Sequence, residues 1–228
     1  MQPETVERLN GLIKELNALE IASRTQYHEY LVREQGEKGS LQQHLDAYAS
    51  LSKFGKPVPE QTINAFGPAL PFPADLVAFY RTHGWLGGGK ALQYLSVYSL
   101  ERLVKNKESK SYVRFHSLGL ADMINYQWSN AREELDPNHE NAIYTQDEID
   151  HLNSNYIVVA TWDDFSWASE AHYYIYYDKQ GRFGILHVHQ DTWYINHMFG
   201  ESPARQTWDQ VMNEALDKIL ASNKELEE

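Results

Sequence analysis

Residues Tyr156 to Asp191 read YIVVATWDDFSWASEAHYYIYYDKQGRFGILHVHQD and contain the clearest strand pattern in the chain. β-Branched and aromatic residues dominate its apolar runs, and turn residues separate these runs, which is typical of consecutive strands. The run 172–177 is apolar or aromatic on both of its faces, because side chains alternate along a strand. We therefore expect this run near the middle of a sheet, joined to the next strand as a hairpin through the turn 178–181.

A long helical pattern precedes this sheet. Apolar residues recur at three- and four-residue steps over residues 5–33, which predicts an amphipathic helix. Ser40 and Gln43 have the spacing of a capping box and predict the start of a second helix. The sequence therefore predicts an N-terminal helical hairpin over residues 1–60, as an extension of a domain at residues 61–228.

The rest of the chain contains shorter predicted elements. They are a helix that begins at Pro73, a strand over 94–100, helices over 121–135 and 145–152, and a final helix capped by Thr207 and Gln210. Between the first two of these, Gly84 to Ala91 nearly spells a phosphate-binding loop. That motif requires Ser or Thr where Ala91 stands, so the stretch is better interpreted as a connection between helix and strand.

Composition limits the partners that this chain can have. Its 228 residues are 42% hydrophobic, enough for an ordinary core. Acidic residues outnumber basic ones by 32 to 20, for a net charge of −12, which disfavours nucleic acid and anionic membranes as partners. The chain has no cysteine, no apolar run of membrane-spanning length and no signal-peptide pattern. We expect a cytoplasmic protein.

The negative charge is concentrated in one segment. Residues 115–178 contain twelve acidic residues and a single base, Arg132, for a net charge of −11. One interpretation is a solvated acidic face that maintains solubility. The other is a surface complementary to a basic partner.

Two histidines form the clearest metal-like pattern. His187 and His189 lie on one face of a predicted strand, and His172, His197 or Asp191 could supply a third ligand. The glutamate that cupin-like barrels place beyond such a pair is absent. The alternative is a pair of hydrogen-bonded histidines at the end of a strand, and we expect neither a metal nor another cofactor.

Aromatic and acidic residues alternate in the connection between the first two strands of the sheet. This pattern could be core with a polar rim, or it could be a binding patch, because interfaces place aromatic anchors among charges. Our candidate partner-binding residues are Trp162, Asp163, Asp164, Trp167 and Glu170. Because Asp163 and Asp164 are adjacent, their side chains tend to diverge, which argues against a paired acid and base. The chain also has no Gly-x-Ser-x-Gly elbow, and we expect no catalytic residue.

Three segments occur in an order that resembles a known family. They are LPFPADLVAFYRTHG at 70–84, the strands 157–160 and 173–178 with the turn at Gly181, and TWDQVM at 207–212. This order is similar to that of the SMI1/KNR4 family, part of the SUKH superfamily, over roughly residues 66–222. The chain departs from the family pattern by an extra Phe72-Pro73 pair and by His83, where asparagine is usual.

The resemblance implies an α+β domain with a curved, mainly antiparallel sheet flanked by helices, and no enzymatic activity. Many bacterial members resemble immunity proteins, which bind and neutralise a toxin, often a nuclease, whereas fungal members resemble regulatory scaffolds. We therefore expect an immunity protein that covers the active site of a basic bacterial toxin. The alternatives are a scaffold protein and a metal-dependent enzyme that uses His187 and His189.

Overall fold

The protein has an α+β fold built on one open antiparallel sheet. The computed structural model describes residues 1–49, 51–66, 70–87, 95–100, 119–127, 136–163, 172–188 and 206–225. Its six strands follow one another across the sheet in chain order, and every pair is antiparallel. The predicted α+β class is confirmed.

The strands are β1 (Lys53–Phe54), β2 (Leu86–Gly87), β3 (Ser96–Val97), β4 (Tyr156–Asp163), β5 (His172–Asp178) and β6 (Phe183–Val188). The last three form the long ladder predicted from the sequence, with β5 between its neighbours. The turn between β5 and β6 contains Gly181 at φ 75°, in the left-handed region that glycine adopts most easily. The carboxylate of buried Asp178 accepts hydrogen bonds from the guanidinium and the backbone N–H of Arg182, which holds this turn closed.

The helices are α1 (Pro3–Tyr30), the π-helix η1 (Leu31–Gln35), α2 (Leu41–Tyr48), α3 (Glu60–Ala65), α4 (Ala74–Thr82), α6 (Leu120–Gln127), α8 (Gln146–Asn155) and α10 (Trp208–Glu225). The predicted caps of the second and last helices are confirmed. Ser40 and Gln43 exchange reciprocal hydrogen bonds, and so do Thr207 and Gln210.

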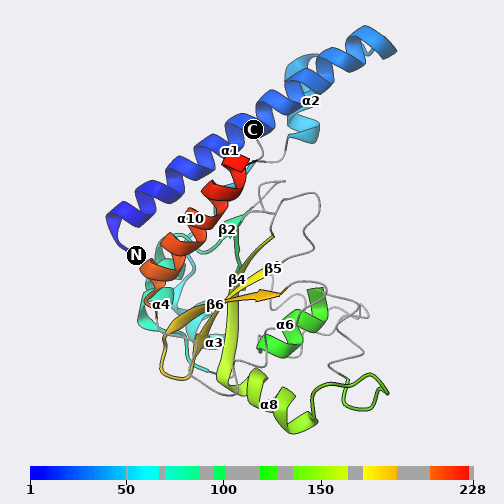
Figure 1. The fold of residues 1–228 in the computed structure, drawn as a ribbon. Helices are drawn as coiled ribbons and strands as arrows, with labels where there is room; N and C mark the ends of the chain where they lie inside the picture. The colour runs from blue at the N-terminus through cyan, green and yellow to red at the C-terminus, as the bar shows by residue number, and fades with distance from the viewer. Residues whose placement is uncertain are drawn as a thin grey trace.

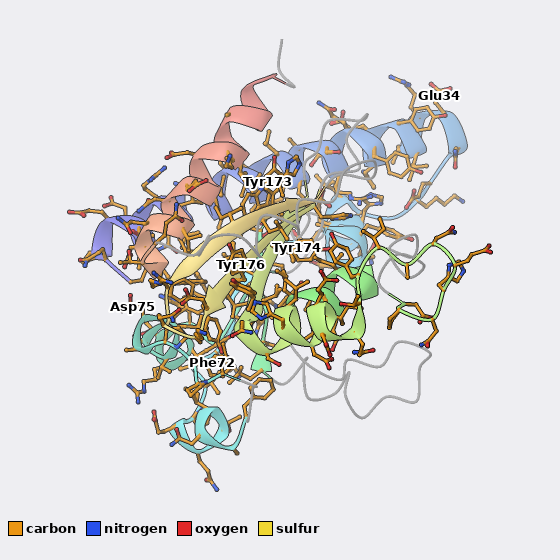
Figure 2. The ribbon with its side chains drawn as sticks, turned by 60° about the horizontal axis from the view of Figure 1, so that its bottom comes forward. Glu34, Phe72, Asp75, Tyr173, Tyr174 and Tyr176 are labelled. Atoms are coloured by element: carbon orange, nitrogen blue, oxygen red, sulfur yellow. The ribbon has the colours of Figure 1, made fainter. Side chains whose placement is uncertain are left out.

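The sheet lies between two layers of helices. Helices α1 and α10 cover one face, and α6 and α8 cover the other (Figures 1 and 2). Successive side chains of β5 point to opposite faces of the sheet. The ring of Tyr173 lies under Lys218 of α10, whereas Tyr176, on the other face, contacts Tyr156. Burial raises the pKa of Tyr177 far above the usual range of a phenol, and its hydroxyl donates to the carbonyl of Leu70.

The first helix shares the core of the domain. Leu9, Leu12 and Leu16 are buried in the same cluster as the sheet residues. Arg8 binds Asp217 of α10 at 2.6 Å. Strand β1 also precedes residue 60, so the predicted extension 1–60 contributes both a helix face and an edge strand to the domain.

Three elements were not predicted. Strands β1 and β2 have two residues each, too few to show an alternating pattern, and β2 lies in the stretch interpreted as a connection. Helix α3 is six residues long and follows Pro59, which supplies no side-chain cap. Such short elements form because neighbouring backbone groups pair, as when Gly55 N–H donates to the carbonyl of Trp85.

Candidate partner-binding face

Trp162, the first of the predicted binding residues, is part of the interior. Its side chain is 3% exposed and stacks on Tyr173, with ring centroids 4.4 Å apart and planes 1° apart. Tyr173 in turn stacks on His187 at 4.4 Å. The three residues lie directly opposite one another on β4, β5 and β6, so the register of the sheet places their rings in one stack. The burial of Trp162 favours the other interpretation of this pattern, core with a polar rim.

The other predicted binding residues stay predictions. Asp163 ends β4, directly opposite His172 in the register. Asp164, Trp167 and Glu170 lie outside the described residues.

The structure also limits the metal hypothesis. His187 is opposite Tyr173 and His172 is opposite Val188, so the imidazoles of His187 and His172 point to opposite faces of the sheet. These two side chains cannot share one ion. His189, Asp191 and His197 lie outside the described residues, and within the described part of the chain no three His, Asp or Glu side chains converge on a possible metal position.

The acidic segment includes one continuous described stretch, residues 136–155. Residues 136–155, which comprise a loop and α8, contain five acidic residues and no Lys or Arg. We call the acidic face the surface formed by Asp136, Glu140, Asp147, Glu148, Asp150 and the loop residue Ile143. Ile143, in the same loop, is 55% exposed. Sequence reasoning missed this residue, because Ile143 stands beside Ala142 and Tyr144 and nothing in the sequence separates exposed Ile143 from buried Tyr144.

Local hydrogen bonds order the loop of the acidic face. The carboxylate of Asp136 accepts hydrogen bonds from the backbone and side-chain N–H groups of Asn138, an Asx-type turn. The backbone N–H of His139 donates to the carbonyl of Asp136, and that of Ala142 donates to the carbonyl of His139. The loop thus presents its carboxylates on a defined backbone.

A capping box begins α8 at the end of this loop. Thr145 Oγ1 accepts from the backbone N–H of Glu148, and Glu148 Oε2 accepts from the backbone N–H of Thr145 at 2.8 Å. Hydrogen bonds from the backbone and then from the hydroxyl of Thr145 lower the pKa of Glu148. Asp147 lies in the same first turn, where the helix dipole favours negative charge.

The inner side of α8 is fixed to α6. Ile149 and Leu152 are buried. Asn153 donates to the carboxylate of Asp122 and accepts from its backbone N–H, both at 3.0 Å. A Cβ atom at Gly119 would lie 2.4 Å from the side chain of Asn153, so only glycine allows this approach. The acidic face is therefore held in place before any partner arrives.

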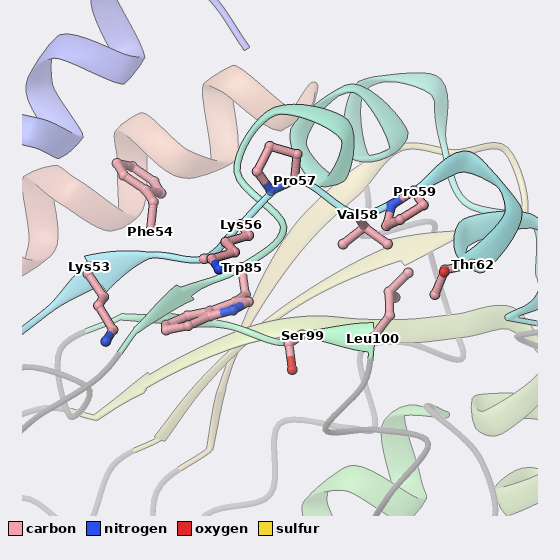
Figure 3. Close-up of a pocket in the computed structure, with 11 residues that line it drawn as sticks. Lys53, Phe54, Lys56, Pro57, Val58, Pro59, Thr62, Trp85, Ser99 and Leu100 are labelled. Atoms are coloured by element: carbon pink, nitrogen blue, oxygen red, sulfur yellow. The ribbon is translucent and has the colours of Figure 1, made fainter.

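A pocket of about 420 Å³ lies at the β1 edge of the sheet and differs chemically from the acidic face (Figure 3). Lys53, Lys56 and Trp85 line it, together with prolines and Ser99. The ring of Trp85 packs flat against Gly55, where a Cβ atom would come within 2.0 Å of it. None of the described lining residues is acidic, and two of them are lysines.

Comparison with known proteins gives no match to a family model, a curated protein or a solved structure. The resemblance to the SMI1/KNR4 family therefore stays a prediction drawn from motif order. None of the described helices combines the length and the apolar character needed to cross a membrane.

Proposed function

We propose that this protein is a non-enzymatic immunity protein of the SMI1/KNR4 type, which acts in the cytoplasm and neutralises a basic toxin by covering its active site. The observation that carries the proposal is the acidic face, since the described stretch 136–155 contains five acidic residues, no Lys or Arg, and an exposed isoleucine. A nuclease has a basic surface where it grips phosphate. An ordered array of carboxylates can occupy that surface in place of the nucleic acid.

The charge of the acidic face would act mainly on the association rate. Complementary potentials raise association rates by roughly one to three orders of magnitude at low ionic strength. Ile143 would then act after encounter, because a buried apolar contact slows dissociation. A rigid loop and helix also reduce the conformational entropy that is lost on binding.

The test is co-expression with the toxin encoded beside this gene, scored by growth and by the association rate of the purified pair. Asp147→Lys/Asp150→Lys reverses two exposed charges that do not cap α8. We expect this variant to associate at least about ten-fold more slowly at low salt and to protect growth less well.

A matched control separates local from total charge. Glu7→Lys/Glu15→Lys makes the same change in net charge on exposed positions of α1. We expect this control to associate within about two-fold of the unaltered protein, since its charges lie far from the acidic face. If both variants slow association equally, or if the unaltered protein does not protect growth, the proposal is wrong.

A further inference from the structure

The first helix extends beyond the domain that it packs against. It is 28 residues long, which corresponds to about 42 Å. Its N-terminal half lies along α10, whereas its C-terminal half, η1 and α2 project from the body (Figure 1). Glu34 in η1 lies far from the sheet residues Tyr174 and Tyr176 (Figure 2). We call residues 19–48 the projecting hairpin.

Exposed apolar side chains gather on the projecting hairpin. Nine large hydrophobic residues are exposed in the described part of the chain, and seven of them lie there: Leu19, Ile21, Tyr27, Tyr30, Val32, Leu41 and Tyr48. Single exposed apolar residues are ordinary, but their concentration on one element marks an interaction surface.

The exposed stripe continues the buried stripe of the same helix. Leu9, Leu12 and Leu16 recur at three- and four-residue steps and are buried. Leu19 follows Leu16 by three residues, and Tyr30 follows Leu16 by two heptads. Both therefore lie on the same face of α1 as the buried leucines. The side chains of Leu19 and Tyr30 are nevertheless 51% and 46% exposed. The apolar face of α1 that packs against the domain therefore continues, exposed, beyond the end of the domain.

Helix α2 extends this stripe sideways. The ring of Tyr27 stacks with that of Tyr30 at 6.3 Å and contacts His44 of α2 at 6.0 Å. His44 in turn contacts Tyr48, with ring centroids 4.9 Å apart. The exposed fractions of Tyr27 and Tyr48 are 50% and 58%. Leu19 and the three tyrosines form what we call the aromatic stripe.

The charge of the projecting hairpin is nearly balanced. It contains five acidic and three basic residues. Glu20 pairs with Arg24, and Arg33 pairs with Glu34. The acidic face lies toward the opposite end of the molecule (Figure 1). Two copies can therefore bring their hairpins together while their most acidic surfaces stay apart.

We infer that two copies of this chain associate through the aromatic stripe about a two-fold axis, with their hairpins forming a four-helix bundle. The four side chains of the stripe leave roughly 400 Å² exposed, taking about 200 Å² for each whole side chain. A standard interface buries about 800 Å² per partner, of which roughly half is apolar. The stripe thus provides the apolar part that a stable dimer needs. This inference does not depend on the proposed function.

The test is the mass of the full chain by sedimentation equilibrium at concentrations from about 1 to 100 µM, because interfaces of standard size have dissociation constants from micromolar downward. Tyr27→Gln/Tyr30→Gln/Tyr48→Gln removes the rings and keeps good helix formers. We expect the unaltered chain to be a dimer, and the triple variant to dissociate at least about 100-fold more readily. Ile143→Gln, which changes an equally exposed apolar residue elsewhere, should leave the dimer intact.

Leu19→Lys provides a second variant at one exposed position, with circular dichroism to show that α1 remains helical. It should dissociate the dimer because it places a charge at the two-fold contact. An unaltered chain that stays monomeric at 100 µM would overturn the inference. So would a triple variant that dimerises as tightly as the unaltered chain, because another surface would then form the contact.

Discussion

The projecting hairpin and the acidic face use the same local structure to present opposite surfaces. Each starts a helix with a capping box, Ser40 with Gln43 in one and Thr145 with Glu148 in the other. The hairpin then exposes tyrosines and leucine with nearly balanced charge, whereas the acidic face has five acidic residues, no base and one exposed isoleucine.

This difference shows that the same local backbone structure can carry an apolar surface or a charged one. An apolar surface acts at short range, through the area that it removes from water. A surface of one charge acts at a distance, through the encounter rate and the ionic strength. The proposed toxin contact and the proposed dimer contact would therefore lie at separate ends of the molecule and would not compete.

The largest expected effect separates the two halves of α1. Leu9→Ala removes a fully buried side chain and should lower the free energy of unfolding by about 3 kcal/mol. Leu19→Ala, on the same stripe but 51% exposed, should change the free energy of unfolding of the monomer by less than about 0.5 kcal/mol. Chemical denaturation at low protein concentration measures both. Equal losses would mean that the hairpin is packed against the body.

Ionic strength should distinguish the two surfaces directly. Raising salt from about 0.1 to 1 M shortens the Debye length from about 10 to 3 Å. Association of the acidic face with a basic toxin should slow by about ten-fold or more, whereas the hairpin dimer should change by less than about two-fold. Stopped-flow mixing and sedimentation give the two values. A dimer that dissociates in high salt would contradict the apolar contact.

The smallest expected effect concerns the contact between α1 and α2. His44 is buried, neither ring nitrogen forms a hydrogen bond with a described residue, and its Nδ1 lies 3.9 Å from the Glu37 carboxylate. His44→Leu should stabilise the protein by about 1 kcal/mol, because it removes polar atoms that are buried without partners. Thermal unfolding at fixed protein concentration measures the change. A loss of similar size would show that the pair with Glu37 stabilises the hairpin.

The central strands and the caps could be predicted because their signals are local. β5 is apolar on both faces, and this property alone placed it between two neighbours. The Ser40 and Thr207 caps depend on residues three positions apart, so spacing is sufficient. The short strands β1 and β2 could not be predicted, because two residues show no alternating pattern and each strand is defined only by its hydrogen bonds to a neighbouring strand.

The exposure of a side chain depends on contacts far away along the chain. Trp162 stands beside acidic residues in the sequence, which left core and binding patch open, and the structure buries its side chain against Tyr173. Leu9 and Leu19 have the same spacing pattern, and only the extent of the body beside α1 makes one core and the other surface.

Residue type and short-range spacing were sufficient to predict the main ladder, the helix caps and the concentration of negative charge, whereas the α+β class was implied by the family resemblance. The solvent exposure of each aromatic residue, and the position of the acidic face relative to the projecting hairpin, became visible only in the folded chain. Burial could not be predicted in the same way, because it depends on residues brought together from distant parts of the chain.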